Sequence, residues 1–265
     1  MIKRLFNLIR TIFRDAPIVG YRAYLTYRLR SYLGSKDPMR VVVEGQSVLV
    51  RPGTPDLRVA FQSLRREFDI LSTLLPANFD GIIVDAGGYI GAAAIKLSKM
   101  YPKATVVSVE PSDANYAVLE KNIQGHKNIH ASKSALHSQG GQDVLLRDRG
   151  TGEWGFSIAL QDTTSSSNVL GSVSTISLGD ISRKFGGKPI GLVKLDIEGG
   201  EYEILKNADT DLQQVPLLFV ELHDRIVPGC SQVFNAFSQG RWVINAGGEK
   251  HLSMIGKPVS ISSNS

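Results

Sequence analysis

The sequence has almost no cysteine and no long apolar run. Cys230 is the only cysteine among the 265 residues, which excludes an intramolecular disulfide and fits a reducing compartment. We expect it to be a small buried side chain rather than a nucleophile. No apolar stretch approaches the roughly 20 residues that a membrane-spanning helix needs. Asn7 and Arg10 interrupt the apolar core that a signal peptide would have, so we expect no export and a cytoplasmic location.

The sequence also lacks an even spread of charge. The formal net charge is +5, and residues 1–40 hold nine Lys and Arg against Asp15 and Asp37. The remainder has 21 basic and 23 acidic residues and is therefore close to neutral. An enzyme of nucleic acids would concentrate basic charge around its working cleft. The charge distribution therefore argues against a nucleic-acid partner.

Two amphipathic patterns occupy the basic extension. In residues 2–14, apolar side chains recur on one helical face and basic side chains lie mostly on the other. Residues 21–33 mix tyrosine and leucine with three arginines. One interpretation is peripheral contact with an anionic membrane through residues 2–33. The other is a pair of helices packed on the main domain with the arginines in water, and the sequence leaves both open.

Four regions are indicated along the chain. They are a basic amphipathic helical extension (1–40), capping strands and a helix (41–80), the main domain (81–259) and a polar tail (260–265). In the capping region we predict a hairpin around Glu44-Gly45 and a single helix over residues 57–75. In the main domain, residues 147–171 form a long loop rich in Gly, Ser and Thr, which we interpret as a lid.

Strand and helix patterns alternate through the main domain. The predicted strands are 81–84, 105–110, 129–134, 143–146, 172–176, 192–196, 217–221 and 241–244, and the predicted helices are 91–100, 113–123, 201–206 and 231–238. Repeated strand–helix–strand units fold into a parallel sheet with helices on both faces. The sequence therefore predicts a doubly wound, mostly parallel α/β fold.

A glycine turn follows the first strand of this domain, in the stretch IIVDAGGYIG of residues 82–91. Asp85 ends the strand, Gly87 and Gly88 let the backbone turn and approach a ligand, and Gly91 opens a helix. Ligands of open α/β sheets bind at such carboxyl ends of strands. A strand–turn–helix unit with no ligand is the alternative.

The motif lacks the three-glycine pattern G-x-G-x-x-G of dinucleotide sites. In those sites a pyrophosphate rests on a helix N-terminus, and a carboxylate before the first glycine would repel it. Such a carboxylate suits a cofactor with hydroxyls and a cationic amino acid end, and S-adenosylmethionine is one. An NAD-dependent oxidoreductase is therefore disfavoured, and it remains an alternative.

Acids follow two more strands of the predicted sheet. Glu110 comes 25 positions after Asp85, where an acid can accept hydrogen bonds from both ribose hydroxyls. In KLDIEGGE, residues 194–201, Asp196 closes an apolar strand and precedes a Gly-Gly turn. Glu201 and Glu203 fit the acid enrichment of a helix N-terminus, which does not account for Asp196.

The stretch FVELHD of residues 219–224 supplies a candidate base. If strand alternation continues, Glu221 and His223 share one face, and a histidine beside a carboxylate is a reasonable general base. Our first candidate for the base is His223 oriented by Glu221, and the second is Asp196. A structural histidine is the alternative. Mg²⁺ binding by Asp196, Glu198, Glu221 and His223 is a further alternative. We predict no metal, because no tight ligand spacing is present.

Taken together, the motifs DAGGYIG, VEP, ALH, KLDIEGGE and VELH resemble the FkbM family of S-adenosylmethionine-dependent O-methyltransferases. The resemblance implies a class I Rossmann-like methyltransferase fold, with the strand end at Ser134-Ala135 near the adenine. The candidate cofactor-binding residues are then Asp85, Gly87, Gly88, Tyr89, Gly91, Glu110, Ser134, Ala135 and Asp196. The resemblance also implies methylation of a hydroxyl on a sugar or other small-molecule or glycan acceptor.

This assignment leaves one rival from another class, a non-catalytic membrane-surface protein that retains the methyltransferase fold. It would use the basic N-terminal residues for binding. For the enzyme we expect direct in-line methyl transfer, in which most of the catalysis is positioning because the cofactor is already activated.

Overall fold

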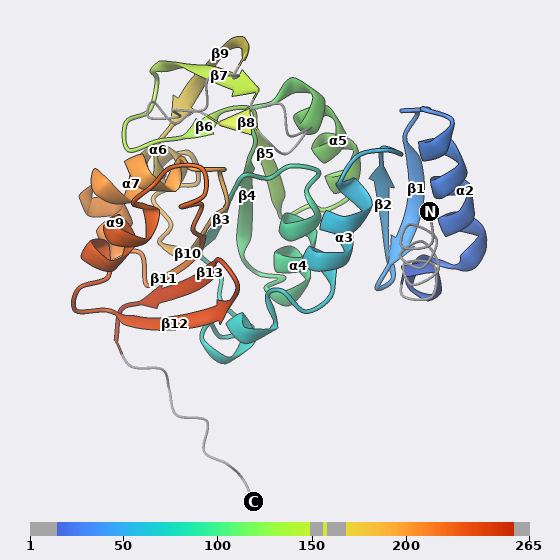
Figure 1. Cartoon of the computed structure of the whole chain (residues 1–265). Helices are drawn as coiled ribbons and strands as arrows, with labels where there is room; N and C mark the ends of the chain where they lie inside the picture. The colour runs from blue at the N-terminus through green and yellow to red at the C-terminus, as the bar shows by residue number, and fades with distance from the viewer. Residues whose placement is uncertain (1–14, 149–155, 158–167, 257–265) are drawn as a thin grey trace, which may run out of the picture. The chain divides into compact units, whose positions relative to one another are not determined.

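The computed structural model describes residues 15–148, 156–157 and 168–256 (Figure 1). The chain separates into two compact units, the first ending at Glu67 and the second beginning at Phe68. The boundary falls inside the predicted capping region 41–80, so residues 68–80 belong to the larger unit. The helix predicted over residues 2–14 and the tail 260–265 lie outside the described residues. Among the described helices, none is both long and apolar enough to span a bilayer.

The first unit contains a helix, a hairpin and a second helix. Its elements are α2 (Tyr21–Tyr32), β1 (Met39–Val43), β2 (Gln46–Val50) and α3 (Asp56–Leu64). The two strands pair antiparallel, with Glu44 and Gly45 both at positive φ in the turn between them, as a tight hairpin turn requires. The predicted hairpin is confirmed. An ion pair of 2.9 Å between Arg51 Nε and Asp56 Oδ2, both buried, fixes the start of α3 on the hairpin.

The single helix predicted over residues 57–75 is wrong. The structure ends α3 at Leu64 and resumes with a short 3₁₀ helix, η1 (Asp69–Thr73). The apolar pattern runs across the break because each part serves a different core. Leu64 is buried in the first unit, whereas Phe68 is buried in the second and packs on Phe219 with ring centroids 5.3 Å apart.

The second unit is built on a seven-stranded sheet with the order β12-β13-β11-β10-β3-β4-β5. Its strands are β3 (Ile82–Ala86), β4 (Thr105–Val109), β5 (Ile129–Ser132), β10 (Ile190–Leu195), β11 (Leu217–Glu221), β12 (Trp242–Gly247) and β13 (Lys250–Met254). The pairs among β11, β10, β3, β4 and β5 are parallel, and β13 and β12 add an antiparallel edge. The predicted doubly wound, mostly parallel sheet is confirmed, although the pattern did not reveal β13.

Helices cover both faces of this sheet (Figure 1). They are α4 (Ala92–Met100), α5 (Asp113–Ile123), α6 (Leu178–Lys184), α7 (Glu201–Lys206), α8 (Thr210–Gln214) and α9 (Cys230–Phe237). The predicted bounds of α5 and the predicted start of α7 match the structure. One face of the sheet forms the main core cluster with side chains such as Ile181 of α6, Leu205 of α7 and Phe234 of α9. Cys230 is fully buried in the same cluster, as expected of a small apolar residue.

A second, smaller sheet has the order β6-β9-β7-β8. Its strands are β6 (Ala135–Leu136), β7 (Asp143–Asp148), β8 (Phe156–Ser157) and β9 (Asn168–Ile176). The loop predicted over 147–171 is therefore wrong at both ends, where β7 and β9 continue their antiparallel pairing. Most of the remaining predicted lid lies outside the described residues.

Candidate active site at the carboxyl ends of the parallel strands

The glycine turn after β3 packs against the neighbouring strands. Gly87 has a φ of 78°, and a side chain there would collide with the backbone carbonyl of Asp196. A side chain at Gly88 would collide with Ser108. Both positions therefore require glycine for the turn to pack against Asp196, which follows β10, and Ser108 of β4. The predicted approach of the two glycines to a ligand stays a prediction. Gly91, with a φ of 82°, is the N-cap of α4, as predicted.

Beneath the glycine turn lies a buried ion pair. Asp85 and Lys194 are 0% and 5% exposed, and Lys194 Nζ lies 2.9 Å from Asp85 Oδ1. Ser108 Oγ donates to the other carboxylate oxygen at 2.8 Å. Lys194 Nζ also donates to the carbonyl of Gly87 at 3.0 Å. Asp85 is therefore paired with a buried cation beneath the turn, and its partner Lys194 is a site residue that our sequence analysis missed.

Glu110 connects the end of β4 to the glycine turn. Its Oε2 accepts a hydrogen bond from the backbone N–H of Tyr89 at 2.8 Å, and its Oε1 accepts one from Ser112 N–H at 2.9 Å. The side chain is only 4% exposed, and burial raises the pKa of Glu110 to about 7 against the effect of these hydrogen bonds. These contacts fix the carboxyl group at the carboxyl end of β4.

The two predicted adenine-side residues lie in different places. Ser134 stays beside the end of β5, and its hydroxyl lies 2.9 Å from that of Ser132. Ala135 begins β6 of the small sheet, and its side chain packs with Leu146 and Val173. The structure therefore keeps Ser134 at the sheet edge, whereas the side chain of Ala135 belongs to a separate apolar cluster.

His223 is held by Glu201 and not by Glu221. The Nδ1 atom of His223 lies 3.0 Å from Glu201 Oε1, and the two side chains are 1% and 0% exposed. Because a carboxylate accepts only, Nδ1 carries the hydrogen. Glu221 instead lies near Lys250, with 3.7 Å between Nζ and Oε2. The predicted orienting role of Glu221 is wrong, because β11 ends at Glu221 and strand alternation stops there.

The other ring nitrogen of His223 faces two carboxylates. Its Nε2 lies 3.8 Å from Asp196 Oδ1 and 4.0 Å from Glu198 Oε2. Burial lowers the pKa of His223, but the hydrogen bond and charge of Glu201 and the charges of Glu198 and Asp196 outweigh it and raise the pKa to about 9. Burial likewise raises the pKa of Glu198 to about 7. The carboxylates around the ring therefore favour the protonated form of His223 at neutral pH.

The same acids bear on the metal alternative. Among the described residues, two triads have ligand atoms within 4.8 Å of one another, Asp196–Glu198–His223 and Glu221–His223–Glu249. His223 belongs to both triads, but Glu221 lies in one of them and Asp196 and Glu198 lie in the other. The four residues that we considered for Mg²⁺ therefore do not form a single set of ligands.

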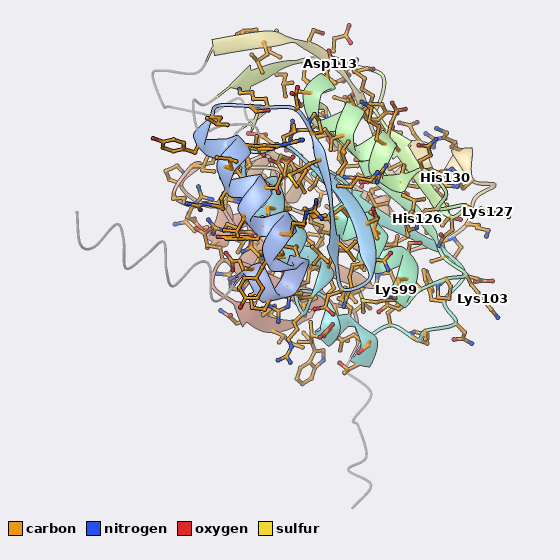
Figure 2. All side chains as sticks on the ribbon, turned by 90° about the vertical axis from the view of Figure 1, so that its right-hand side faces the viewer. Lys99, Lys103, Asp113, His126, Lys127 and His130 are labelled. Carbon is orange, nitrogen blue, oxygen red and sulfur yellow. The ribbon has the colours of Figure 1, made fainter. Side chains whose placement is uncertain are left out.

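The amino ends of the parallel strands β4 and β5, at the opposite edge of the sheet, carry basic side chains in place of the acids. Lys103 and Lys127, which precede β4 and β5, lie at the surface there (Figure 2).

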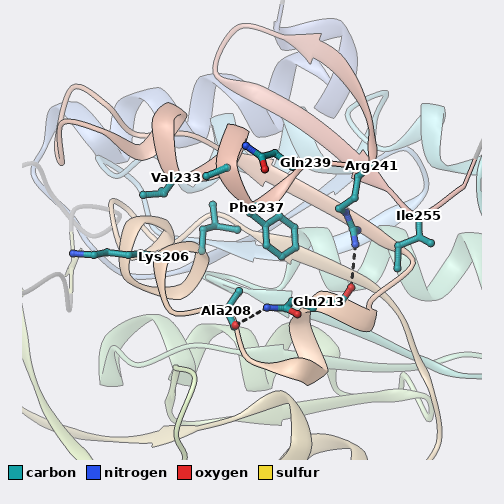
Figure 3. A pocket seen from close by; sticks show the side chains of 10 residues that line it. Lys206, Ala208, Gln213, Val233, Phe237, Gln239, Arg241 and Ile255 are labelled. Atoms are coloured by element: carbon teal, nitrogen blue, oxygen red, sulfur yellow. Dashed lines mark hydrogen bonds between the residues drawn. The ribbon is translucent and has the colours of Figure 1, made fainter.

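A hollow of about 540 Å³ lies near the start of β11, where Arg241 Nη1 donates to the carbonyl of Gln213 at 3.2 Å (Figure 3). It is lined by none of the predicted site residues.

The comparison with known proteins agrees with this geometry. The family model described as the methyltransferase FkbM domain matches residues 85–239. The chain belongs to the FkbM methyltransferase family. It is a methyltransferase, and its sheet has the mostly parallel Rossmann-like order that the motifs implied.

This FkbM methyltransferase is similar in sequence to named methyltransferases. It is 26% identical over 188 residues to Methyltransferase 1 of Beauveria bassiana, a match of 62% of this chain and 73% of that protein. It is also 26% identical over 208 residues to the hexuronic acid methyltransferase AglP of Haloferax volcanii, covering 76% of this chain and 83% of that protein. A solved precorrin-6y C5,15-methyltransferase from Geobacter metallireducens aligns with a TM-score of 0.44 at 12% identity, over 72% of this chain and 86% of that one.

Two residues of this FkbM methyltransferase's site were missed from the sequence, and each had a detectable signal. Lys194 is a lone cation within the apolar strand GLVKL of residues 191–195, and a buried charge needs a partner. Glu201 was interpreted as a helix-start acid. It does begin α7, where it accepts hydrogen bonds from the N–H groups of Ile197 and Gly199 at 2.7 and 2.8 Å, and it also holds His223.

Proposed function

We propose that this FkbM methyltransferase uses S-adenosylmethionine to methylate a hydroxyl oxygen of a sugar or other small-molecule or glycan acceptor. The observation that carries the proposal is the set of carboxylates at neighbouring strand ends, Glu110 after β4 and Asp196 after β10. A ribose with two hydroxyls and a cationic sulfur nucleoside match such an acidic edge. Bound there, the cofactor supplies an activated methyl group on a sulfonium.

Glu110 is the residue best placed to bind the ribose. The N–H groups of Tyr89 and Ser112 hold its two oxygens in a fixed orientation, and Asn115 Nδ2 is a second, longer donor to Oε1 at 3.4 Å. A ribose hydroxyl can therefore donate to the second lone pair of Oε2, and a hydroxyl that donates to Oε1 would replace the Asn115 contact. Tyr89, at a φ of 48°, takes part through its backbone and so connects the glycine turn to this contact.

Asp196 is the proton acceptor in our proposal. As the acceptor oxygen bonds to the methyl carbon and the carbon–sulfur bond breaks, the hydroxyl proton must leave. Asp196 lies at the strand end with its side chain 35% exposed, so a substrate hydroxyl can reach it. His223, our first candidate from the sequence, holds a proton at neutral pH, and an imidazolium cannot accept another. We therefore assign His223 the positioning of Asp196, with Glu201 fixing the ring.

The acceptor class is proposed from chemistry and from one relative. The name of AglP specifies a hexuronic acid, so a uronic acid glycoside is the first acceptor to test. Asp196 is not followed by the Pro-Pro-Tyr or Pro-Pro-Phe that amino-directed nucleic-acid methyltransferases carry, which supports an oxygen acceptor.

Ligand-dependent stability tests the cofactor directly. We expect S-adenosylhomocysteine at 100 times its dissociation constant to stabilise the protein by about 2.7 kcal/mol, and NAD to have no such effect. Stabilisation by NAD alone would favour the oxidoreductase alternative. Incubation with labelled S-adenosylmethionine and a uronic acid glycoside then tests transfer. Cofactor binding without transfer to any acceptor in a cell lysate would favour the non-catalytic alternative.

A further inference from the structure

Helix α2 carries an exposed apolar stripe. Tyr21, Leu25, Leu29 and Tyr32 are 52%, 53%, 59% and 88% exposed. At about 100° of rotation per residue, these four side chains fall within an arc of roughly 80°. Isolated exposed apolar residues are ordinary on protein surfaces, but a row along one helix face marks an interaction site.

The opposite side of α2 is fixed within the first unit. Tyr24 and Tyr27 are buried, and Tyr27 Oη donates to the carbonyl of Thr54 at 2.9 Å. Ser31 Oγ accepts a hydrogen bond from the N–H of Gly53 at 2.9 Å. These contacts set the rotation of the helix, so the stripe faces away from the turn at Gly53-Thr54.

The stripe is bordered by positive charge. Arg22 and Arg28, both exposed, lie about 20° beyond either side of its arc. No acidic residue occurs between Asp15 and Asp37, a segment that also contains Arg30 and Lys36. A partner for this surface must therefore be apolar beneath a layer of negative charge.

We propose that the stripe and its arginines dock the protein on the surface of an anionic phospholipid bilayer. Leucine and tyrosine side chains enter the boundary between headgroups and acyl chains, and arginines contact lipid phosphates. A second copy of α2 fits less well, because the helix contains no acidic residue and pairing would bring only further arginines. This surface does not depend on the proposed catalytic function.

Vesicle sedimentation with the full chain tests the proposal. We expect binding to vesicles of phosphatidylcholine and phosphatidylglycerol, and much weaker binding to phosphatidylcholine alone. The double variant Arg22→Gln/Arg28→Gln should bind the anionic vesicles about thirtyfold more weakly at low salt. Added salt should weaken the original protein and affect this variant less.

The apolar contribution has its own variant and control. Leu25→Gln/Leu29→Gln should weaken binding to the anionic vesicles at least tenfold at any salt concentration, because neither side chain is buried in the fold. Leu145→Gln/Val243→Gln changes two side chains of similar exposure in the second unit and should bind like the original protein.

Two results would overturn the proposal. One is equal sedimentation of the original protein and Leu25→Gln/Leu29→Gln with the anionic vesicles. The other is a dimer in light scattering that becomes a monomer in that variant, which would assign the stripe to a second copy. Since none of these measurements uses a cofactor or an acceptor, their outcome is separate from that of the methyl-transfer experiments.

Discussion

His223 donates its Nδ1 hydrogen to Glu201, the first residue of α7, over 3.0 Å. Both side chains are buried, and the same carboxylate closes the turn between β10 and α7 through the N–H groups of Ile197 and Gly199. The contact therefore joins the turn after β10 to the segment after β11. It explains why Asp196, Glu198 and the histidine ring meet at one point.

Replacing this carboxylate should weaken the fold. In Glu201→Gln an amide group would face one of the two backbone N–H donors, and His223 would lose its charged partner. We expect the free energy of unfolding to fall by roughly 3–5 kcal/mol, measured by urea denaturation. Glu203→Gln on the same helix is the matched control and should change it by less than about 0.5 kcal/mol. Equal effects of the two variants would contradict the role given to Glu201.

The pH dependence of the rate distinguishes the two candidate bases. If Asp196 accepts the proton, kcat should stay level as the pH rises past the pKa of His223, which is about 9. Asp196→Asn should then lower kcat by roughly 10²–10⁴-fold, with less than about a tenfold change in S-adenosylhomocysteine affinity. A rate that climbs through that pKa and loses this pH dependence in His223→Gln would return the base role to His223.

Cofactor affinity should depend on the ionisation of Glu110. Its pKa is raised from 4.5 to about 7, and a ribose hydroxyl donates to the ionised form. We expect affinity for S-adenosylhomocysteine to fall by up to tenfold for each pH unit below about 7, measured by calorimetric titration. Glu110→Gln should bind at least tenfold more weakly and lose this pH dependence. Glu120→Gln, an exposed acid on α5, should keep it.

The same shift predicts the stability of the cofactor-free protein. Because the folded state raises the pKa of Glu110, it binds the proton more tightly than the unfolded chain. The resulting contribution to stability is fully present below pH 4.5 and is lost as the pH rises to about 7. Urea denaturation across this range should show a smaller decline in Glu110→Gln than in the original protein. An identical decline in both would place the titration elsewhere.

The buried pair beneath the glycine turn should be strongly coupled. Lys194→Met leaves the Asp85 carboxylate without its cation, and we expect a loss of roughly 3–5 kcal/mol in the free energy of unfolding. Adding Asp85→Asn should recover part of that loss, which a double-mutant cycle measures. Lys103→Met, at the surface labelled in Figure 2, is the control for removing a lysine. Additive effects of the two site substitutions would contradict the coupling.

Methyl transfer should survive metal removal. Nε2 of the protonated His223 already lies 3.8 Å from Asp196 Oδ1 and 4.0 Å from Glu198 Oε2, so a cation at this triad would have to displace that proton. We expect the rate after dialysis against EDTA to match the rate before it. Loss of activity that returns on adding Mg²⁺ would contradict this prediction and support the metal alternative.

The sequence by itself determined the sheet and the acids at its edge. Short apolar strands with an acid near or just after their carboxyl ends, namely Asp85, Glu110 and Asp196, can be identified locally, because burial on both faces removes alternation. Parallel strands then place their carboxyl ends at the same edge. The starts of α5 and α7, at Asp113 and Glu201, were likewise predictable from the local sequence. These features depend on residues close together in the chain.

Only the tertiary structure decided which side chains meet. The sequence indicated Glu221 as the partner of His223, whereas the structure places Glu201 there. The choice depends on how the chain turns after β11 relative to the start of α7. The break between Leu64 and Phe68 could not be seen in the sequence, because the apolar spacing continues across it although the two residues are buried in different units. Pairings of this kind are set by packing between distant segments, and no local period of the sequence encodes them.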